Sequence, residues 1–345
     1  MKGFLWAFVL LVALYAAYSI FRITRDTAPD FSVYYGVAQN ALSGKGIYGD
    51  PHLFTGYGYP PYSILPYLPL ALLPYHVSQS IWIIGSFIGL IASVFLSFKL
   101  YYKKASFQTK AIACAFAFLA FPSRFTLGMG QSNLIVLFVL LSSLVYRSGI
   151  LMGLAWILKP QLMILAVLLI IKRQWKIFIP SFLVVLLAAL STGFVFGWPW
   201  YQQYFTRELP MLMEFRGREI YYNQGIEAFV SRIGMPSLSI ILKIIAVAVS
   251  TFVLRKQSCI HAVPLVLSLL LLIMPLSWQH HYVFLLPAMI FLWRYFQSTL
   301  FWIAMVLVSF NIKEPSLYGP IVLSHVFFGN TLVFWLLSRV HSRKL

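Results

Sequence analysis

Twelve apolar runs separated by short polar loops decide what this chain can fold into. A backbone inside lipid must satisfy its own hydrogen bonds, so only helices and closed barrels span a membrane. An open sheet does not explain a run such as 134–146, because its strand edges would be unpaired in lipid. Of the 345 residues, 61% are hydrophobic and only 10% are charged, unlike a soluble domain. The sequence therefore predicts an all-α, polytopic integral membrane protein with about twelve transmembrane or partly spanning helices.

The loops that join these runs carry very unequal charge. The runs cover residues 3–21, 78–98, 111–122, 131–146, 149–158, 161–171, 177–197, 236–254, 260–276, 282–297, 299–311 and 320–338. If the N-terminus is inside and the runs alternate, the inside loops hold fifteen cations and no carboxylate. Because cytoplasmic loops are enriched in Lys and Arg, this predicts that both termini face the cytoplasm. The membrane is expected to be the cell membrane, which is the inner or plasma membrane. The net charge of +18 then serves orientation and contact with anionic lipid, and no nucleic-acid partner is expected.

Three segments qualify this simple alternation. We interpret residues 4–20 as a retained first helix, because no clear A-x-A cleavage site follows them. Runs 149–158 and 161–171 are each too short to cross a bilayer. One fused helix would reverse every later loop, so we expect a short hairpin with Lys159 at its tip, although the sequence leaves both arrangements open. A polar tip at that depth requires a watery cavity, which would open to the outer face.

Two long outer loops cover residues 23–77 and 198–235. In the first, Asp30 can cap a helix over residues 31–42 that Gly44 would close. Five prolines between residues 57 and 75 argue against a regular spanning helix there, so we expect an interfacial or re-entrant segment. With no internal repeat and no low-complexity linker, residues 1–345 are expected to form a single membrane-embedded domain.

The eight acidic residues all fall in three loops that the charge pattern places outside, facing the periplasm or exterior. A carrier or pore should instead hold ionisable groups along its path at mid-bilayer. The distribution therefore favours a membrane enzyme with a one-sided site. Asp30 is the first catalytic candidate, since it directly follows the first run and precedes aromatic residues. Asp26 is its nearest rival, but it lies beside Arg22 and Arg25 and is expected to be paired.

Polar side chains also interrupt or flank the later runs. Arg124 suits a phosphate, and Gln131 and Asn133 carry planar amides that suit sugar hydroxyls, although amides at a helix start can also be simple caps. Lys159 lies between two apolar runs and needs an anion or an aqueous cavity. His280 and His281 would diverge by about 100° on an α-helix, which makes one shared metal awkward. They are expected to hydrogen-bond a phosphate or hydroxyl, or to anchor the interface.

Several sequence segments, taken in order, are similar to those of a known family. They are the aspartate after the first helix, Gly44 to Tyr48, Tyr59-Pro60-Pro61, Gly130-Gln131-x-Asn133, Lys159-Pro160, Asn223-Gln224 with Arg232, and Ser277-Trp278-x-His280-His281. The set resembles glycosyltransferase family 87, the polyprenol-phosphate-mannose-dependent mannosyltransferases of the GT-C superfamily. Two departures, Gly225 after Asn223-Gln224 and Pro275-Leu276-Ser277 for a usual S-P-x-S, put the acceptor more than the chemistry in question.

The resemblance implies a GT-C architecture and transfer of a hexose, expected to be mannose, from a polyprenyl-phosphate donor to an acceptor hydroxyl on the outer face. It implies that Asp30 is the general base. One base suffices for a direct, inverting displacement, and because no acidic pair such as D-x-D is present, no metal or other cofactor is expected. The residues expected to bind the donor phosphate are Lys159, Arg124, His281 and His280. The residues expected to bind sugar or acceptor are Gln131, Asn133, Tyr59, Asn223, Gln224, Arg232 and Trp278. The partners would be the donor lipid, a glycolipid or glycan acceptor and membrane lipids.

Other functions fit parts of the same sequence. A GT-C transferase using another prenyl-phosphate sugar, such as arabinose, glucose or aminoarabinose, would keep the fold and the base. A secondary transporter or lipid flippase would need acids at mid-membrane and paired repeats, which the sequence lacks. An inactive scaffold subunit would leave Asp30 dispensable.

Overall fold

The computed structural model describes residues 2–49, 56–214 and 217–340. Asp50, Arg216, Arg343 and Lys344, which entered the charge count, lie outside these ranges. Within them the chain is helical and contains no β-strand, and one isolated bridge pairs Asn223 with Trp278. The all-α prediction is therefore confirmed.

Each of the twelve apolar runs is helical over most of its length. The α-helices are α1 (Lys2–Arg25), α2 (Pro29–Leu42), α3 (Leu68–Ala71), α4 (Tyr75–Tyr101), α5 (Phe107–Leu119), α6 (Phe121–Met129), α7 (Asn133–Tyr146), α8 (Gly149–Leu158), α9 (Ile164–Ile171), α10 (Trp175–Phe196), α11 (Pro199–Gln203), α12 (Leu209–Met213), α13 (Ile226–Arg232), α14 (Leu238–Leu254), α15 (Cys259–Ile273), α16 (Leu286–Phe291), α17 (Thr299–Ser309), α18 (Pro320–Leu323) and α19 (His325–Arg339). The 3₁₀ turns are η1 (Pro61–Tyr67), η2 (Pro160–Met163), η4 (Gln279–Leu285), η5 (Leu292–Tyr295) and η6 (Pro315–Leu317), and η3 (Tyr204–Glu208) is a π-helical turn.

Three of the described helices are long and apolar enough to cross a membrane by themselves. They cover Gly3–Arg25, Tyr75–Tyr101 and Trp175–Phe196, and the α5–α6 pair, bent by 62°, adds a fourth if it counts as one span. The other apolar helices are 10–17 residues long. These helices support a membrane protein, whereas the expected number of about twelve spans is not confirmed.

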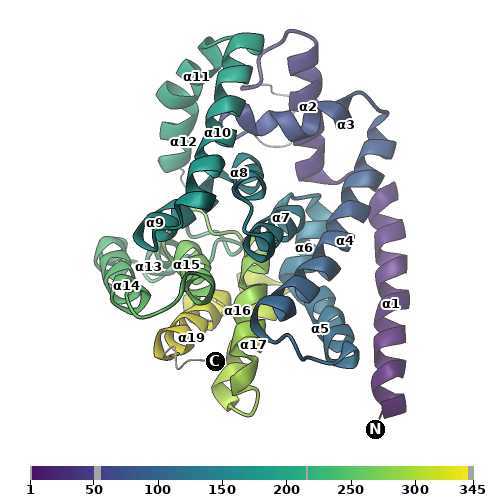
Figure 1. Cartoon of the computed structure of the whole chain (residues 1–345), viewed down its shortest axis with the longest axis vertical. Helices are drawn as coiled ribbons and strands as arrows, with labels where there is room; N and C mark the ends of the chain where they lie inside the picture. Colours follow the sequence, from purple (N-terminus) through teal and green to yellow (C-terminus); the bar gives the residue numbers. More distant parts are fainter. Residues whose placement is uncertain (1, 50–55, 215–216, 341–345) are drawn as a thin grey trace. The chain divides into compact units, whose positions relative to one another are not determined.

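The chain packs as two compact units, each assembled from three segments. Unit 1 comprises Met1–Ala92, Thr126–Gln161 and Trp175–Phe215, and unit 2 comprises Ser93–Phe125, Leu162–Gln174 and Arg216–Leu345. In unit 1, α8 packs against α7 and α10 (Figure 1). A Cβ atom at Gly153 would lie 2.7 Å from Val184 Cβ, and one at Gly149 would overlap the carbonyl of Ile177. These two small residues, four apart on α8, therefore let α10 approach closely.

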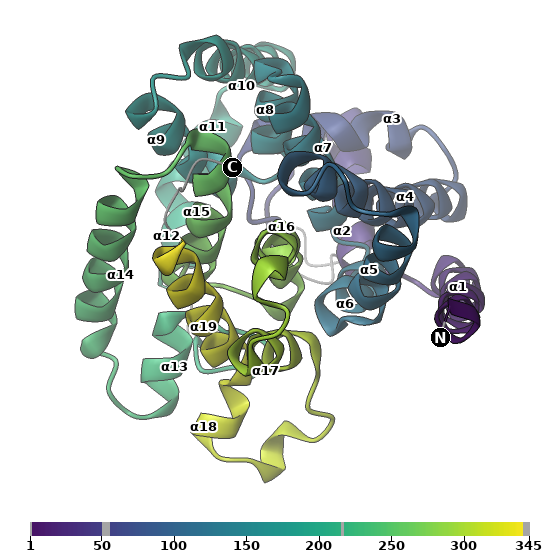
Figure 2. The same ribbon diagram turned by 60° about the horizontal axis from the view of Figure 1, so that its bottom comes forward.

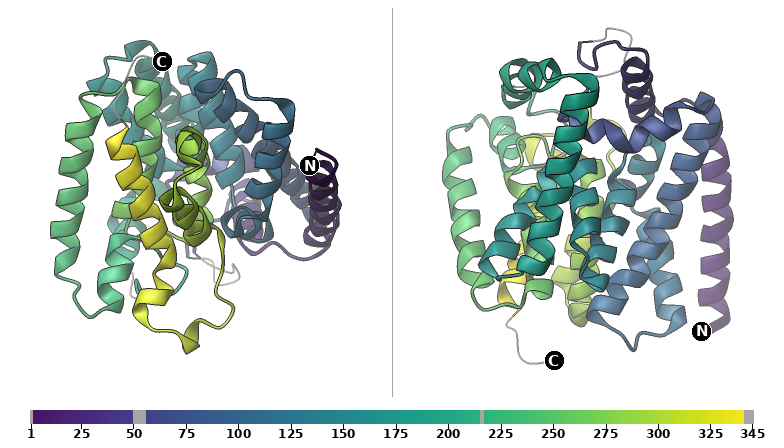
Figure 3. Two further views of the ribbon diagram at one scale, coloured as in Figure 1. Left: turned by 90° about the horizontal axis from the view of Figure 1, so that it is seen from below. Right: turned by 45° about the horizontal axis from the view of Figure 1, so that its top comes forward.

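Unit 2 is organised around α15, which is buried along most of its length. Helices α14 and α19 pack against it (Figure 2), and α17 lies beside the yellow α19 (Figure 3, left). Ser268 Oγ on α15 donates to Asn330 Oδ1 on α19 at 2.7 Å, and Asn330 Nδ2 donates back to the Ser268 carbonyl at 3.1 Å. This reciprocal polar pair fixes the register of two apolar helices.

Two local expectations can now be compared with the structure. Gly44 has φ +71° just after α2, as the expected glycine closure requires. The N-cap prediction for Asp30 is wrong: α2 begins at Pro29, its N-cap is Ala28, and Asp30 lies within the first turn. The carboxylate of Asp30 bonds a distant amide instead of the helix N–H groups.

The chain is also broken in the two proline segments where the sequence indicated interruption. The proline-rich segment forms only η1 and the short α3. Helix α8 ends at Leu158, and η2 begins at Pro160, whose ring cannot continue a helix from the preceding residue. The break at Lys159 is thus confirmed, and the hairpin expected there stays a prediction.

Candidate active site

The connection that leads to Asp30 is held by a buried amide on α4. Gln79 Oε1 accepts the backbone N–H of Ala28 at 2.9 Å. Its Nε2 donates to the carbonyls of Asp26 at 2.6 Å and Ile23 at 3.1 Å. Because Gln79 is fully buried, these bonds replace water for a turn that has little secondary structure of its own. The start of α2, and with it Asp30, is therefore fixed to α4.

A tight turn between α6 and α7 meets the start of α2. Gly130 has φ +69°, and a Cβ atom there would lie 2.6 Å from Phe31 Cβ and 2.9 Å from Ala28 Cβ. Trp82 Nε1 donates to the Gly130 carbonyl at 2.9 Å and holds the turn from the α4 side. Only glycine permits both the left-handed backbone and this close approach. The next residue, Gln131, is thereby brought against Asp30.

Asp30, Gln131 and Lys159 form a hydrogen-bonded network inside unit 1. Gln131 Nε2 donates to Asp30 Oδ2 at 2.6 Å. Gln131 Oε1 accepts from Lys159 Nζ at 3.1 Å and from the Tyr34 hydroxyl at 2.7 Å. A lysine ammonium can only donate, so the amide oxygen must face Lys159 and the amide nitrogen must face Asp30. The orientation of the Gln131 side chain is therefore determined by its partners.

Lys159 is fully buried at the end of α8. Its Nζ donates to the Tyr59 hydroxyl at 2.6 Å and lies 5.0 Å from the centre of that ring. Among the described residues Lys159 and Asp30 form no direct ion pair, because the amide of Gln131 stands between them. A buried lysine needs a nearby anion, and here the anion is Asp30, which Lys159 reaches through the amide of Gln131.

The Asp30 carboxylate is buried, with only 9% of the residue exposed. Burial raises the pKa of Asp30 above its usual value, while the Gln131 hydrogen bond and the charge of Lys159 lower it. Tyr34 stacks on Tyr67 at 4.7 Å and closes one side of the network. A carboxylate held in this way accepts a proton more readily than one in water.

Apart from Asn133, which lies in unit 1, the remaining candidates lie in unit 2, where several of them join two loops. Asn223 Oδ1 accepts the backbone N–H of Ser277 at 2.8 Å, and Asn223 Nδ2 donates to the Pro275 carbonyl at 2.9 Å. The Gln224 backbone N–H donates to the Ser277 carbonyl at 2.8 Å. Gln224 Nε2 donates to the Leu323 carbonyl at 2.7 Å. Both side chains therefore hold this part of the fold together.

Arg232 is engaged in the same way. Its guanidinium donates to the carbonyls of Glu219 at 2.9 Å and Ile220 at 2.7 Å, to that of Asn223, and to Ser324 Oγ at 2.9 Å. Burial lowers the pKa of Arg232 to about 10, so the group stays charged near neutral pH. Sugar binding by Asn223, Gln224 and Arg232 stays a prediction beside this observed structural role.

His280 and His281 lie in the buried 3₁₀ turn η4. Their rings are 4.5 Å apart and nearly perpendicular, and Phe125 packs edge-on against His280 at 5.4 Å. No group of three or more metal-binding side chains occurs in the part of the chain that the structure describes. Trp278 is half-buried just before the pair, and the exposed Arg124 donates from Nε to the Leu119 carbonyl at 3.1 Å.

The family model described as glycosyltransferase family 87 matches residues 57–310. This chain belongs to glycosyltransferase family 87. It is therefore a glycosyltransferase, and the resemblance drawn from its motifs is confirmed. Gln131 and Lys159 lie inside the matched range, whereas Asp30 precedes it.

Two curated relatives of this family 87 enzyme come from Mycolicibacterium smegmatis (strain ATCC 700084 / mc(2)155). One is a polyprenol-phosphate-mannose-dependent alpha-(1-2)-phosphatidylinositol pentamannoside mannosyltransferase, 26% identical over 76% of this chain and 68% of its own length. The other is a polyprenol-phosphate-mannose-dependent alpha-(1-2)-phosphatidylinositol mannoside mannosyltransferase, 22% identical over the same shares of the two chains. No solved structure matches the family 87 chain.

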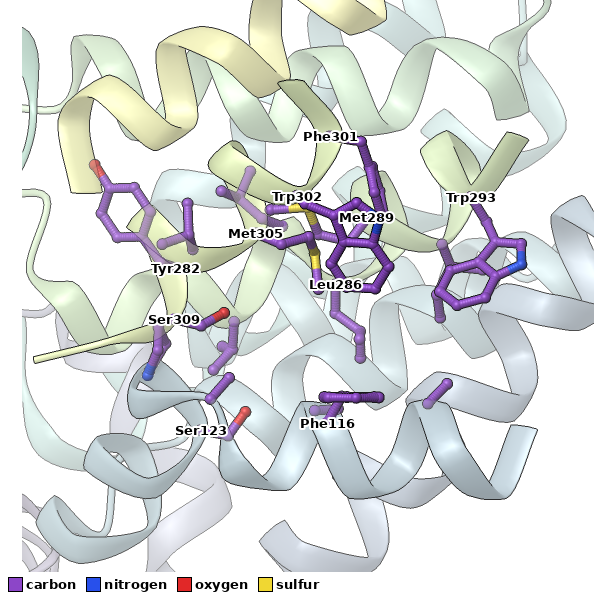
Figure 4. Close-up of a pocket in the computed structure, with 18 of the residues that line it drawn as sticks. Phe116, Ser123, Tyr282, Leu286, Met289, Trp293, Phe301, Trp302, Met305 and Ser309 are labelled. Atoms are coloured by element: carbon purple, nitrogen blue, oxygen red, sulfur yellow. The ribbon is translucent and has the colours of Figure 1, made fainter. Parts of the chain in front are cut away.

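Unit 2 of the enzyme also contains an apolar groove between α5 and the helices α16 and α17, of about 780 Å³ counting its open side. Figure 4 shows Phe116 on one side and Met289, Trp302 and Met305 on the other. Ser123, Ser309 and Tyr282 lie toward one end of the groove, while the other end is lined by apolar and aromatic side chains. The groove therefore has one polar end and one apolar end.

Of the predicted site residues, the structure brings Asp30, Tyr59, Gln131 and Lys159 together, and Asn133 is buried at the start of α7. Tyr34 joins this network although it was not among the candidates. Its spacing is the available signal, because residues four apart on a helix share a face with Asp30. Gln79 was also missed, and its only signal is a lone amide near the start of an apolar helix.

Proposed function

We propose that this enzyme transfers a hexose from a polyprenyl-phosphate sugar to a hydroxyl of a glycolipid acceptor on the outer face of the membrane, with Asp30 as general base. The observation that carries the proposal is the buried Asp30 carboxylate held by Gln131 beside the buried Lys159. The names of both relatives support mannose as the sugar and a phosphatidylinositol-linked glycan as the acceptor class. The charge bias of the loops supports a topology with both termini inside.

The proposed reaction is a direct displacement. As the acceptor oxygen attacks the anomeric carbon, Asp30 takes its proton, and the carbon–oxygen bond to the lipid phosphate breaks. Retention through a double displacement would need a second carboxylate about 5 Å away to act as nucleophile. Asp26 does not fit that role, because its side chain is 73% exposed and lies 4.0 Å from Arg22. Among the described residues of unit 1, Asp30 is the one buried carboxylate, which supports inversion.

The leaving group is a phosphate, which needs positive charge more than a strong acid. The candidates for that role are Arg124, His280 and His281 in unit 2 and, separately, Lys159 in unit 1. The polar end of the unit 2 groove supports it, because Ser123 precedes Arg124 and Tyr282 follows His281 in the chain. We propose that the prenyl chain of the donor lies in this groove with its phosphate at the polar end.

The decisive experiment is sugar transfer from radiolabelled polyprenyl-phosphate-mannose to phosphatidylinositol mannosides, using membranes that contain the overproduced protein. We expect a lipid-soluble labelled product that requires the wild-type chain. Polyprenyl-phosphate-linked glucose and arabinose, offered in parallel, test the identity of the sugar. If the folded protein transfers sugar from none of the three donors, the proposed function is wrong.

Filling the groove should discriminate between long and short donors. Ala117→Trp places a large side chain in the apolar part of the groove and is expected to raise the donor KM about tenfold for a long prenyl chain, since less apolar surface is buried. A donor with two isoprene units should be little affected. The measurement is donor KM for both chain lengths, with Ile244→Trp on the exposed face of α14 as the matched control. An equal rise for both donors would contradict a prenyl chain in the groove.

A further inference from the structure

Lys159 and Gln131 point to a role different from those the sequence suggested. We propose that Gln131 is a positioning residue that fixes one oxygen of Asp30 and connects the charge of Lys159 to that carboxylate. The other oxygen, Oδ1, is left to take the acceptor proton. This inference rests on the proposed function of Asp30 as the base.

The hydrogen-bond directions carry the argument. Oε1 of Gln131 receives two donors, Lys159 Nζ and the Tyr34 hydroxyl. Donation to the oxygen of an amide polarises it and strengthens its N–H groups as donors. Gln131 Nε2 donates one of these N–H groups to Asp30 Oδ2 at 2.6 Å. In the described part of the chain Oδ1 accepts no hydrogen bond, so the two oxygens of the carboxylate are not equivalent.

Burial gives this arrangement its strength. Lys159 is fully buried, Gln131 is 7% exposed and Asp30 is 9% exposed. Water cannot screen charges in such a place, so a cation one amide away matters more than it would at the surface. The Gln131 amide therefore connects the positive charge of Lys159 to the Asp30 carboxylate.

The groups around Asp30 leave Lys159 as its counter-charge. The titratable groups that face it are Tyr34 on α2, Tyr67 on η1 and Lys159 at the end of α8, and Tyr59 in the loop before η1 contacts Lys159. Helix α4 contributes Gln79 and Trp82, which hold the neighbouring turns and do not titrate, and Tyr75, which packs on Phe31. Tyrosine is neutral near pH 7, so among the described residues Lys159 is the cation that acts on this carboxylate.

The alternative is that Lys159 serves only the leaving phosphate. In that case Lys159→Met would weaken donor binding and leave the pH dependence of turnover unchanged. If Lys159 acts on Asp30, the same variant removes the charge that opposes burial and raises the pKa of Asp30. The acidic limb of the pH–rate profile then moves to higher pH, because the base must be deprotonated to work.

The test is the pH dependence of kcat for wild type, Lys159→Met, Lys159→Arg and Gln131→Met. On the acidic limb, where the rate rises with pH, we expect the kcat of Lys159→Met and Gln131→Met to be about tenfold below that of wild type. At high pH, where the base is deprotonated, their kcat should partly recover. Lys159→Arg keeps the charge and should restore the wild-type limb. An unshifted limb in both methionine variants, with only the donor KM changed, would overturn the inference.

Thermal unfolding tests the same point without activity. A native pKa above the unfolded value means that stability falls as pH rises through the native pKa. In Lys159→Met this fall should extend to higher pH than in wild type, and adding Asp30→Asn should remove it. Identical pH profiles of Lys159→Met with and without Asp30→Asn would overturn the inference. Because this readout needs no substrate, it separates failure of the inference from failure of the proposed transferase reaction.

Discussion

Asp30→Asn is expected to lower the rate of sugar transfer by about 10²- to 10⁴-fold at saturating substrates. Asparagine keeps the size of the side chain, and its oxygen can still accept the bond from Gln131 Nε2. What is lost is the ability to take a proton from the acceptor hydroxyl. The fold should survive, because the substitution removes a buried negative charge. Initial rates with labelled donor, at equal amounts of protein, measure the loss.

The matched control is Asp26→Asn. Asp26 is four residues earlier, is highly exposed and lies near Arg22 at 4.0 Å. Exposed ion pairs contribute little, so its activity and stability should stay near wild type. Equal transfer by wild type and Asp30→Asn would remove Asp30 from the mechanism, and equal losses in both variants would point to a general effect on the first loop.

Gly130→Ala is expected to lower the free energy of unfolding by about 2–5 kcal/mol, the second large effect. Part of this cost is the left-handed backbone at φ +69°, and part is the overlap of a new Cβ atom with Phe31 and Ala28. Relief of that overlap would shift Gln131 away from Asp30, so transfer should fall together with stability. Thermal unfolding in detergent and initial rates at a temperature where the variant is folded check both effects.

Gly128→Ala, two residues earlier at the end of α6, provides the comparison. Gly128 lies in α6, and a Cβ atom there would meet nothing within 4 Å. Alanine is favoured over glycine inside a helix by roughly 0.5–1 kcal/mol, so this variant should be as stable as wild type or slightly more so. A similar loss in both variants would show that the close approach at Gly130 is not what positions Gln131.

The helices were predictable because their signal is local. Apolar runs of helical length indicate where the helices lie, and Lys159-Pro160 predicts a break that the structure confirms. The predicted N-cap of α2 was wrong because the helix N–H groups compete with other donors for the same carboxylate. An aspartate beside Pro29 suits an N-cap, yet Asp30 bonds the amide of Gln131, which lies 101 residues away in the sequence. Nothing local reveals such a partner.

The candidate site shows the same limit. Lys159 was singled out because a lysine between apolar runs is costly. Gln131 was singled out because its amide suits sugar hydroxyls, and Tyr59 because it belongs to one of the motifs of the resemblance. Their mutual contacts form only when the loop before η1, the turn between α6 and α7 and the end of α8 come together in the fold. Gln131 was assigned to a ligand because a free amide suits hydroxyls, whereas in unit 1 both ends of that amide already have partners. Chemistry could be read from residue types, and connectivity could not.

The buried Lys159 has a consequence for how the protein enters the bilayer. Lys159 lies at the break between two apolar helical segments, where insertion costs up to about 2.5–3.5 kcal/mol, the value for a lysine at the centre of a spanning helix. Its partners, Tyr59 and Gln131, come from separate segments of unit 1. Helix α8 is therefore poorly retained in lipid until those segments have folded around its end. Completion of the site and stable membrane residence of α8 become a single event, so a chain in which the site fails to form is also exposed to the quality control of the membrane.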